Sequence, residues 1–525
     1  MKSMKYILKT AAAAMLAILA SVSCTKDPSE SFTDIENRSL RAWIDKNRPD
    51  LLENYQEEGA YYVEVFDAGA ADSISISKVI EQSEADDELD GCWIFFNLTG
   101  RDLQGQVCLT RDAWTARMEG TFTKFTHYVP YMRFVGTENV SLMEGTYLAM
   151  KNKITLGRKY AADNGLPTEL YVRYGTRLRL YLPSSLAGGT AGVSGDGGYE
   201  GQFSLDSNKP MIMELSVTGR INNPVAFEAC VVDGFGTANG GISPLKESDD
   251  DDKNDDKAEE DDDNDEVDDG MAWRHACDTI PGLLVSKRYT PATRFDFAFD
   301  FTVDDEEEDH SAAKTMRNEI YSDSDPANIY NNFDALESQI NDALLERFGE
   351  GVFDGSKIGG DGKAKIWYIC RFLDGFIADT NISEIRGLLY GPDEASDTEL
   401  TYSPENNRSD YVPAWYYAIQ NLRYGQWAAI VSTSTFAYGS AGRSGSTSTS
   451  SSGSTFSYMP YYNYYNYYNS YYGSSYYDMY YYNYYNNYLY NSYADPEVST
   501  TTTTSTEVQS YTPLIFQIFI EPKEE

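Results

Sequence analysis

Apolar and polar residues alternate over several short segments of the chain, and this pattern predicts β-strands. Successive side chains of a strand point to opposite faces, so a period of two is typical of a strand with one buried face. The candidate strands are, in chain order, 61–66, 93–99, 177–182, 211–217, 365–372, 427–431 and 514–520. They form an early and a late group separated by a long stretch, which predicts two β-rich domains.

Apolar residues at helical spacing predict a smaller number of helices. These helices are expected within 31–55, over 331–348 and over 415–422. Leu40, Trp43 and Ile44 would lie on one face of the first helix. Pro49 would end or kink it, because proline lacks the amide hydrogen that a helix interior needs.

The N-terminus has the pattern of an export signal. Lysines precede the apolar stretch 10–22, which is shorter than the roughly 20 residues that span a bilayer as a helix. Cys24 follows after Ser23, and a polar tether begins after it. This resembles a bacterial lipoprotein processing site, although Ser21 stands where leucine is usual. The resemblance implies a signal peptide over 1–24 and lipid attachment at Cys24.

Such an anchor would place the protein in the bacterial cell envelope, lipid-anchored to a membrane, with the outer membrane favoured and the chain periplasmic or surface-exposed. The alternative is an ordinary cleaved signal with an incidental cysteine. Five cysteines remain beyond Cys24, so at least one lies outside any intrachain pair. The sequence does not set their connectivity.

An acidic run divides the chain. Fifteen of the 21 residues in 249–269 are Asp or Glu and two are Lys, so the run carries 2 − 15 = −13 charges. It lacks the glycine-centred loop of an EF-hand, and a solvated, self-repelling linker is the favoured interpretation. We therefore expect a linker region over 223–330.

A second compositional break is rich in Ser, Thr and Tyr and spans 443–510. Its central part, 458–493, holds 19 tyrosines, many in YYN steps. No aliphatic pattern supports a packed core there. Two interpretations stay open, namely an adhesive or self-associating loop and a solvated insertion without a specific role.

Charge and motif content exclude several classes of function. The formal charge of −40 opposes binding to phosphate backbones, so nucleic acid is not an expected partner. The chain has three histidines and no CxxC pair, which argues against a zinc centre. The usual local motifs of P-loop nucleotide hydrolases, zinc proteases and elbow-type serine hydrolases are also missing.

Residues 415–442 give a short helix, a glycine turn, an alternating strand and the tripeptide Ala-Tyr-Gly. This order resembles the FKBP-type peptidyl-prolyl isomerases. Upstream, 368–381 resembles the family's strand, Asp-Gly turn and strand, and downstream 514–520 resembles its closing strand. The resemblance covers roughly 361–442 and 511–521. The whole chain looks like a tandem FKBP-like lipoprotein of the Bacteroidetes kind.

The resemblance implies a set of site residues. Trp415 stands where the family places the indole floor of its proline pocket, and Tyr438 stands at the tyrosine whose hydroxyl bonds a substrate carbonyl. Further walls of the pocket match Tyr368, Asp379 and Phe516. The backbone amide of Val412 matches a second ligand donor.

Two departures from the family pattern concern the pocket walls. Ala378 replaces a wall phenylalanine, which would open the pocket, and Tyr402 stands for the wall phenylalanine of the following strand. The chemistry needs no cofactor, because an X–Pro amide loses resonance as it twists and a dry aromatic pocket favours the less polar twisted form. The alternative is that Trp415, Tyr438 and Phe516 are core aromatics of an inactive domain.

The first half shows the same plan without the pocket. The family's pocket residues are replaced, and neither Leu142 nor Met143 restores the tryptophan. Residues 151–174 are extra between helix and strand. The replacements are Leu98 for the tyrosine, Cys108 for the phenylalanine, Leu109 for the acid, Gly188 for the Ala-Tyr-Gly tyrosine and Met213 for the closing-strand phenylalanine.

The expected fold class is therefore α+β, with two FKBP-like domains, each an antiparallel sheet curved around a short helix. A tether and amphipathic helix over 25–55 would precede a degenerate domain over 56–222 and a second domain over 331–525. Segment 514–520 should pair with 365–372 despite the insert, because loop closure costs little more as a loop lengthens.

The expected function is that of an envelope-anchored peptidyl-prolyl isomerase or folding chaperone for exported proteins, with activity in the second domain. Its partners would be proline-containing polypeptides and, through the lipid anchor, a membrane. The alternative is a non-catalytic FKBP-like surface lipoprotein for binding or adhesion.

Overall fold

The computed structural model describes most of both domains. Three segments singled out above lie outside the described residues: the signal peptide with Cys24, the acidic run and the tyrosine-rich stretch. The described residues are 31–83, 91–120, 122, 126–140, 142–193, 204–243, 272–276, 282–303, 315–318, 333–352, 355–359, 362–392, 395–403, 411–450 and 500–523.

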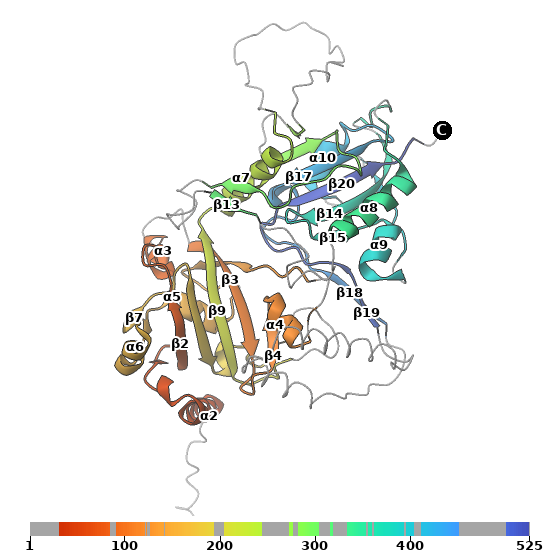
Figure 1. The fold of residues 1–525 in the computed structure, drawn as a ribbon. Coiled ribbons are helices and arrows are strands. Elements are labelled where there is room, and N and C mark those ends of the chain that lie inside the picture. Colours follow the sequence, from red (N-terminus) through yellow and green to blue (C-terminus); the bar gives the residue numbers. More distant parts are fainter. Residues whose placement is uncertain are drawn as a thin grey trace, which may run out of the picture.

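The described residues form two large antiparallel sheets, one in each half of the chain (Figure 1). The first has, in spatial order, β1 (Tyr55–Gln56), β2 (Tyr61–Ala68), β8 (Thr176–Leu182), β9 (Met211–Ile221), β3 (Gly91–Arg101) and β4 (Val107–Thr110), with β5 (Tyr131–Gly136) also on β3. The second has β10 (Arg274–His275), β11 (Leu283–Ser286), β17 (Trp427–Ser432), β20 (Leu514–Ile520), β14 (Ala364–Phe372) and β15 (Ile377–Thr380), with β16 (Leu400–Tyr402) also on β14. The two sheets therefore share one topology.

Helices pack on both sheets, which confirms the α+β class. The first half holds α2 (Phe32–Asn47), α3 (Ile76–Ser83), α4 (Ala113–Met118), α5 (Glu144–Lys151) and α6 (Arg158–Asn164). The second holds α7 (Pro224–Ala238), α8 (Phe333–Phe348), α9 (Ser383–Tyr390) and α10 (Pro413–Ile419). Short two-stranded ribbons are formed by β6 (Ile154–Thr155) with β7 (Glu169–Leu170), β12 (Asp300–Thr302) with β13 (Thr315–Arg317), and β18 (Ser446–Ser450) with β19 (Thr500–Ser505).

The closing strand β20 lies at the centre of the second sheet. It pairs with β14 on one side and β17 on the other, with Cys370 opposite Phe516 and Tyr368 opposite Ile518. The prediction that 514–520 joins the sheet of 365–372 is therefore confirmed. All seven residues of β20 are buried, which explains why this segment is apolar except for Gln517 instead of alternating.

The domains begin earlier in the chain than we predicted. Helix α2 packs into the first core, where Leu40 and Ile44 are fully buried. In the second domain, α7 takes the corresponding place and buries Val232 and Phe235 in that core, while β11 joins the sheet. Segment 223–330 is therefore not only a linker, because its described parts supply a helix and sheet strands. The acidic run and the short strands hid these elements from the sequence pattern.

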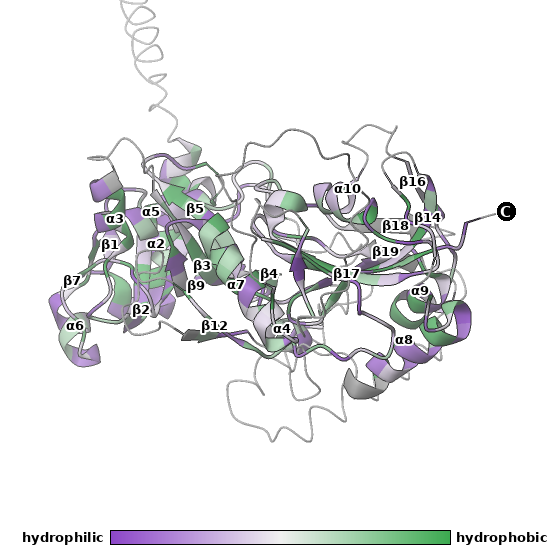
Figure 2. Cartoon of the chain, turned by 90° about the horizontal axis from the view of Figure 1, so that it is seen from above, coloured by the Kyte–Doolittle hydropathy of each residue, from purple (hydrophilic) through white to green (hydrophobic). Residues whose placement is uncertain are grey.

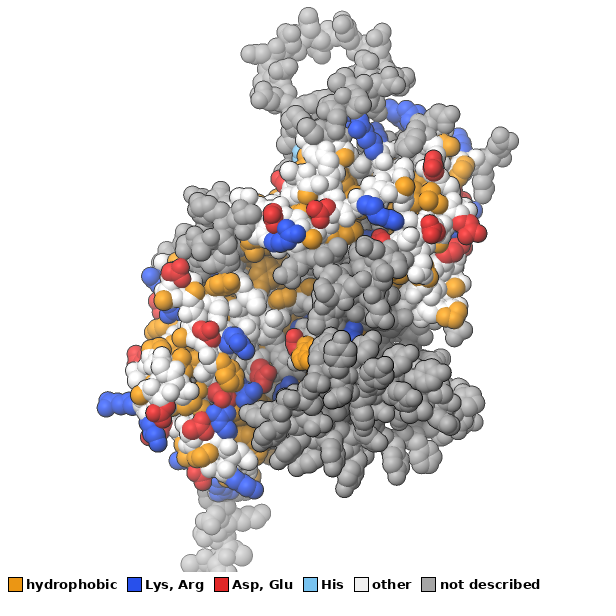
Figure 3. Space-filling view, viewed as in Figure 1, with side chains coloured by type: hydrophobic (Ala, Val, Ile, Leu, Met, Phe, Trp, Pro, Cys, Tyr) orange, Lys and Arg blue, Asp and Glu red, His pale blue; other side chains and the backbone are white. Residues whose placement is uncertain are grey.

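The two cores are separate clusters of buried side chains, and Figure 2 shows hydrophobic residues along the central strands. On the face seen in Figure 3, Lys and Arg side chains are interspersed with Asp and Glu. No helix among the described residues is both long and apolar enough to cross a bilayer.

Hydrogen bonds at two places join the domains. Met132 of β5 donates its amide hydrogen to Gln509 at 3.3 Å, and Gln509 donates to the carbonyl of Pro130. His127 is hydrogen bonded to Asp374 of the second domain. These contacts lie on the two segments that flank β14 and β20, so the first domain touches the second close to its central strands.

Candidate functional site

Three of the predicted pocket aromatics form one cluster on the second sheet. Tyr368 of β14 and Trp415 of α10 have ring centroids 5.1 Å apart at 67°, and Trp415 and Phe516 of β20 are 5.6 Å apart at 81°. Such edge-to-face packing is the favoured geometry of aromatic pairs. Trp415 is 5% exposed and Phe516 is 1% exposed. The indole therefore lies across the sheet with its neighbours' rings edge-on to it.

A polar network adjoins this cluster. The hydroxyl of Tyr368 donates to Oδ2 of Asp379 at 3.2 Å. Arg443 donates from Nη1 to the same oxygen at 2.8 Å and to the hydroxyl of Tyr438 at 3.1 Å. The structure thus brings five of the predicted residues into one connected site: Tyr368, Asp379 and Tyr438 through hydrogen bonds, and Trp415 and Phe516 through ring contacts.

The protonation of Tyr438 follows from its surroundings. Burial raises the pKa of its hydroxyl to about 12, with a further contribution from nearby Cys370. The hydroxyl therefore keeps its proton at neutral pH. Because it accepts a hydrogen bond from Arg443, its own hydrogen remains available to a carbonyl oxygen. The sequence resemblance assigns this hydroxyl the role of a donor to a substrate carbonyl, and that role stays a prediction.

Val412 caps the N-terminus of α10. Its carbonyl accepts from the amide of Trp415 at 3.0 Å, and Pro413 follows it as the first helical residue. Within the described part of the chain, the amide of Val412 makes no hydrogen bond, and the residue is half-buried. A cap position with an extended backbone leaves this donor outside the helical ladder, as Pro413 predicts.

The indole nitrogen of Trp415 is buried and has no hydrogen-bond partner among the described residues. An unsatisfied buried donor costs about 1–3 kcal/mol. The indole N–H and the Val412 amide come from the same short helix. Together they make α10 a source of two unused donors beside the aromatic cluster.

The two departures noted in the sequence lie at the edge of this site. Ala378 is fully buried in β15, and its carbonyl accepts from the amide of Thr506 at 2.8 Å. Tyr402 is also buried, and its ring packs on that of Tyr411, with 5.6 Å between the ring centroids.

The first domain repeats this framework with other side chains. Leu98 and Met213 occupy the sheet positions of Tyr368 and Phe516, because Gly100 pairs with Met213 as Cys370 pairs with Phe516. Likewise, Leu109 occupies the position of Asp379, because Leu109 lies opposite Gly100 as Asp379 lies opposite Cys370.

The tryptophan position of the first domain is the third residue of α5. Trp415 is third in α10, and Thr146 is third in α5. The Thr146 hydroxyl contacts the sulfur of Met213 at 2.8 Å, just as the indole contacts Phe516. Sequence comparison placed the gap at Leu142 or Met143, and the structure assigns it to Thr146.

Two residues of the site were not found from the sequence. Arg443 lies just beyond the Ala-Tyr-Gly loop, and its backbone is fixed by a pair of hydrogen bonds to Val508 at 2.8 Å each. Its position five residues after Tyr438 is the signal that would have marked it. The second residue is Glu228 of α7, whose carboxylate accepts hydrogen bonds from Ser434. Nothing in the sequence marked it, because a single acidic residue within a helix is not a distinctive pattern.

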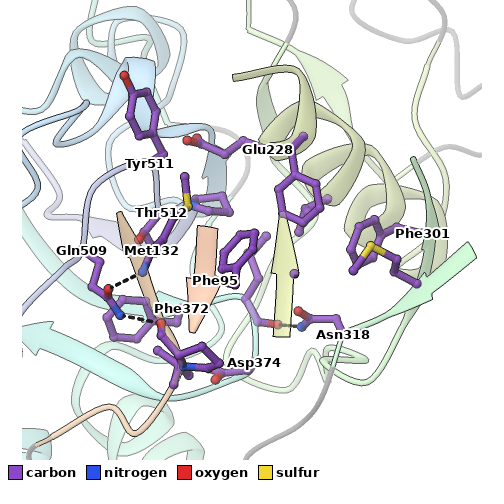
Figure 4. Close-up of a pocket in the computed structure, with 18 of the residues that line it drawn as sticks. Phe95, Met132, Glu228, Phe301, Asn318, Phe372, Asp374, Gln509, Tyr511 and Thr512 are labelled. Carbon is purple, nitrogen blue, oxygen red and sulfur yellow. Dashed lines mark hydrogen bonds between the residues drawn. The ribbon is translucent and has the colours of Figure 1, made fainter. Parts of the chain in front are cut away.

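A cavity of about 400 Å³ lies between the domains, and Glu228 is among the residues that line it (Figure 4). Its walls are mostly apolar and come from both halves, among them Phe95, Met132, Phe301 and Phe372. None of the six predicted site residues lines it. Among the described residues, no group of three or more His, Cys, Asp and Glu side chains is arranged to hold a metal ion.

No protein-family model matches the chain, and no curated protein matches it either. Similar solved structures include the three FKBP domains of wheat FKBP73, with 8% identity over 89% of this chain and 95% of that chain and a TM-score of 0.19. Another is a peptidyl-prolyl cis-trans isomerase of Pseudomonas syringae pv. tomato, with 13% identity over 37% and 98% and a TM-score of 0.20. FkpA from Escherichia coli has 13% identity over 41% and 71% and a TM-score of 0.20. These TM-scores are low, so the function has to come from the chain's own site.

Proposed function

We propose that the protein is an FKBP-type peptidyl-prolyl cis-trans isomerase or folding chaperone for exported polypeptides, with its activity in the second domain. The observation that carries this proposal is the contact of Trp415 with Tyr368 and Phe516 beside the Tyr438 hydroxyl. The same residues carry the sequence resemblance to the family.

Catalysis would rest on stabilising a twisted X–Pro amide. The barrier of about 18–20 kcal/mol comes from amide resonance, which is lost at the twisted geometry. An apolar ring such as the indole of Trp415 favours the less polar twisted amide over the planar one. The Tyr438 hydroxyl and the Val412 amide would hold the substrate carbonyls on either side of that bond.

The protein would act at the envelope. Cys24 would carry the lipid, and the tether that follows would separate the domains from the membrane surface. Clients would be recognised by their proline residues, because the site offers an aromatic floor and hydrogen-bond donors to carbonyl oxygens, while its charged residues Asp379 and Arg443 are paired with each other.

A second function is favoured by one observation. Trp415 and Phe516 are almost fully buried by their neighbours, as expected for core aromatics of a non-catalytic domain. In that case the protein would be a surface lipoprotein for binding or adhesion, and the isomerase site would have no turnover.

The test is a proline-isomerisation assay on the purified full chain with a short X–Pro peptide. The proposal expects measurable catalysis that Tyr438→Phe reduces by roughly ten-fold or more, because one carbonyl donor is lost. A folded wild-type protein without catalysis would favour the binding alternative.

A further inference from the structure

The loop that carries Tyr438 is organised around Ser434. This serine begins the short 3-10 turn Ser434–Phe436 at the end of β17. Its carbonyl accepts from the amides of Ala437 and Gly439, each at 2.8 Å. The residues on both sides of Tyr438 are therefore tied to one carbonyl, and the position of Tyr438 depends on how Ser434 is held.

Ser434 is held by a carboxylate from another element. Glu228 of α7 accepts from the Ser434 amide with one oxygen and from the Ser434 hydroxyl with the other, the latter at 2.7 Å. Glu228 is 1% exposed and Ser434 is 2% exposed. Figure 4 shows the Glu228 side chain leaving α7 at the border of the interdomain cavity. A buried carboxylate with both oxygens on one residue fixes that residue's position and orientation.

The first domain contains the same arrangement. Glu36 of α2 accepts from the Ser184 amide at 2.6 Å and from its hydroxyl at 2.8 Å. The Ser184 carbonyl accepts from Ala187 and Gly189, as Ser434 does in the second domain. Only the residue between differs, since Gly188 stands where Tyr438 stands. The first domain is thus a built-in control for the carboxylate without the tyrosine.

We propose that Glu228 is a positioning residue of the candidate isomerase site, which holds the Tyr438 loop against the aromatic cluster. This inference rests on the proposed function, because it assigns a catalytic purpose to Tyr438. Helix α7 precedes the second sheet in the chain and lies outside the segment that resembles the isomerase family. Its contribution to the site is the Glu228 carboxylate.

Substitutions at Glu228 distinguish the effect of its hydrogen bonds to Ser434 from the effect of its side-chain volume. Glu228→Ala leaves the amide and hydroxyl of Ser434 buried without hydrogen-bond acceptors. The turn is then expected to move so that these two groups find other partners. Glu228→Gln keeps both bonds, because its amide oxygen accepts from the Ser434 amide and its NH₂ group donates to the Ser434 hydroxyl. Glu36→Ala removes the equivalent carboxylate in the first domain, so that Ser184 loses the same two hydrogen bonds.

The experiment measures kcat and KM of the full-length variants with an X–Pro peptide and, on the same proteins, hydrogen exchange of the 434–439 amides. We expect Glu228→Ala to lower kcat at least about ten-fold with faster exchange confined to 434–439. Glu228→Gln should restore kcat to within about three-fold of wild type. Glu36→Ala should leave kcat at the wild-type level.

Three results would overturn the inference: wild-type kcat in a folded Glu228→Ala protein, equal losses for the Ala and Gln variants, or an equal loss for Glu36→Ala. If Glu228→Ala does not fold, Ser434→Ala replaces it, because that change removes only the hydroxyl bond. If wild type shows no catalysis, the proposed function fails, and hydrogen exchange then tests separately whether Glu228 holds the Tyr438 loop. Unchanged exchange at 434–439 in Glu228→Ala would refute that role of Glu228 as well.

Discussion

The guanidinium of Arg443 lies over the ring of Tyr438, 5.0 Å from its centroid, and donates a hydrogen bond to its hydroxyl at 3.1 Å. The same nitrogen bonds Asp379, so a single cation fixes both the acid and the tyrosine of the candidate site. A hydroxyl that accepts from a cation is a stronger donor toward a third group. Arg443 therefore both orients the Tyr438 hydroxyl and strengthens it as a donor.

Replacing Arg443 should weaken the site without unfolding the domain. Arg443→Met keeps much of the apolar contact with Tyr438 but removes three charge-assisted bonds, to Asp379, to Tyr438 and to the carbonyl of Thr506. We expect kcat/KM for an X–Pro peptide to fall roughly ten-fold.

Arg347→Met is a matched control, because Arg347 pairs in the same domain with Glu384 and Asp397, neither of which belongs to the candidate site. It should leave kcat/KM unchanged. Equal activity of both variants and wild type would show that Arg443 only stabilises the fold.

Stability of the second domain should depend on pH through Glu228. Burial raises the pKa of its carboxyl from 4.5 to about 7, while the Ser434 bonds oppose the rise. The folded state then binds more protons than the unfolded state between these two values. Unfolding free energy should therefore fall as pH rises from 4.5 to 7, by on the order of 3 kcal/mol, and level off above.

Glu228→Gln should remove this contribution, because the amide does not titrate. Denaturant unfolding of wild type and variant at pH 5 and pH 8 measures the difference. An identical loss of stability between the two pH values in both proteins would contradict the assignment to Glu228.

The first domain should contribute no catalysis of its own. Leu98, Thr146, Gly188 and Met213 replace its pocket aromatics and hydroxyl, so it offers neither an indole floor nor a tyrosine donor. In the full chain, the double variant Trp415→Leu/Tyr438→Phe should show only the uncatalysed rate. Substantial residual catalysis in this folded variant would place activity in the first domain.

Anchoring can be tested at Cys24. If the N-terminal segment is a lipoprotein signal, cells fed a tagged fatty acid should label the wild-type chain, and the protein should sediment with membranes. Cys24→Ser should abolish the label, whereas Cys108→Ser, at a buried thiol whose pKa burial raises to about 12, should not. Labelling of the Cys24→Ser chain would rule out this attachment site.

The sheets were predictable because their signal is local. Alternation located 61–66 and 177–182, and two largely apolar runs, 427–431 and 514–520, matched the buried strands β17 and β20. The aromatic cluster was also found, because the order of Tyr368, Trp415, Tyr438 and Phe516 along the chain resembles a family pattern. Both the periodicity of apolar residues and the order of motifs can be read from a single sequence without knowledge of tertiary contacts.

The polar contacts were not predictable, because they join residues far apart in the chain. Glu228 and Ser434 are 206 positions apart, and Glu36 and Ser184 are 148 apart. An acid on a helix is usually solvated, so neither glutamate is distinguished before its partner is known. For the same reason, α7 and β11 were assigned to a linker, since their role in the second domain depends on tertiary pairing.

The central claim is that Trp415 is the floor of a working proline pocket and not a core residue. The direct measurement compares X–Pro isomerisation by full-length wild type and Trp415→Leu, with circular dichroism on both and Trp114→Leu, an exposed position of the first domain, as control. The account predicts catalysis by wild type and by Trp114→Leu, and loss of most of it in a folded Trp415→Leu protein. Unchanged, substantial activity of a folded Trp415→Leu protein, or no activity in wild type, would contradict it.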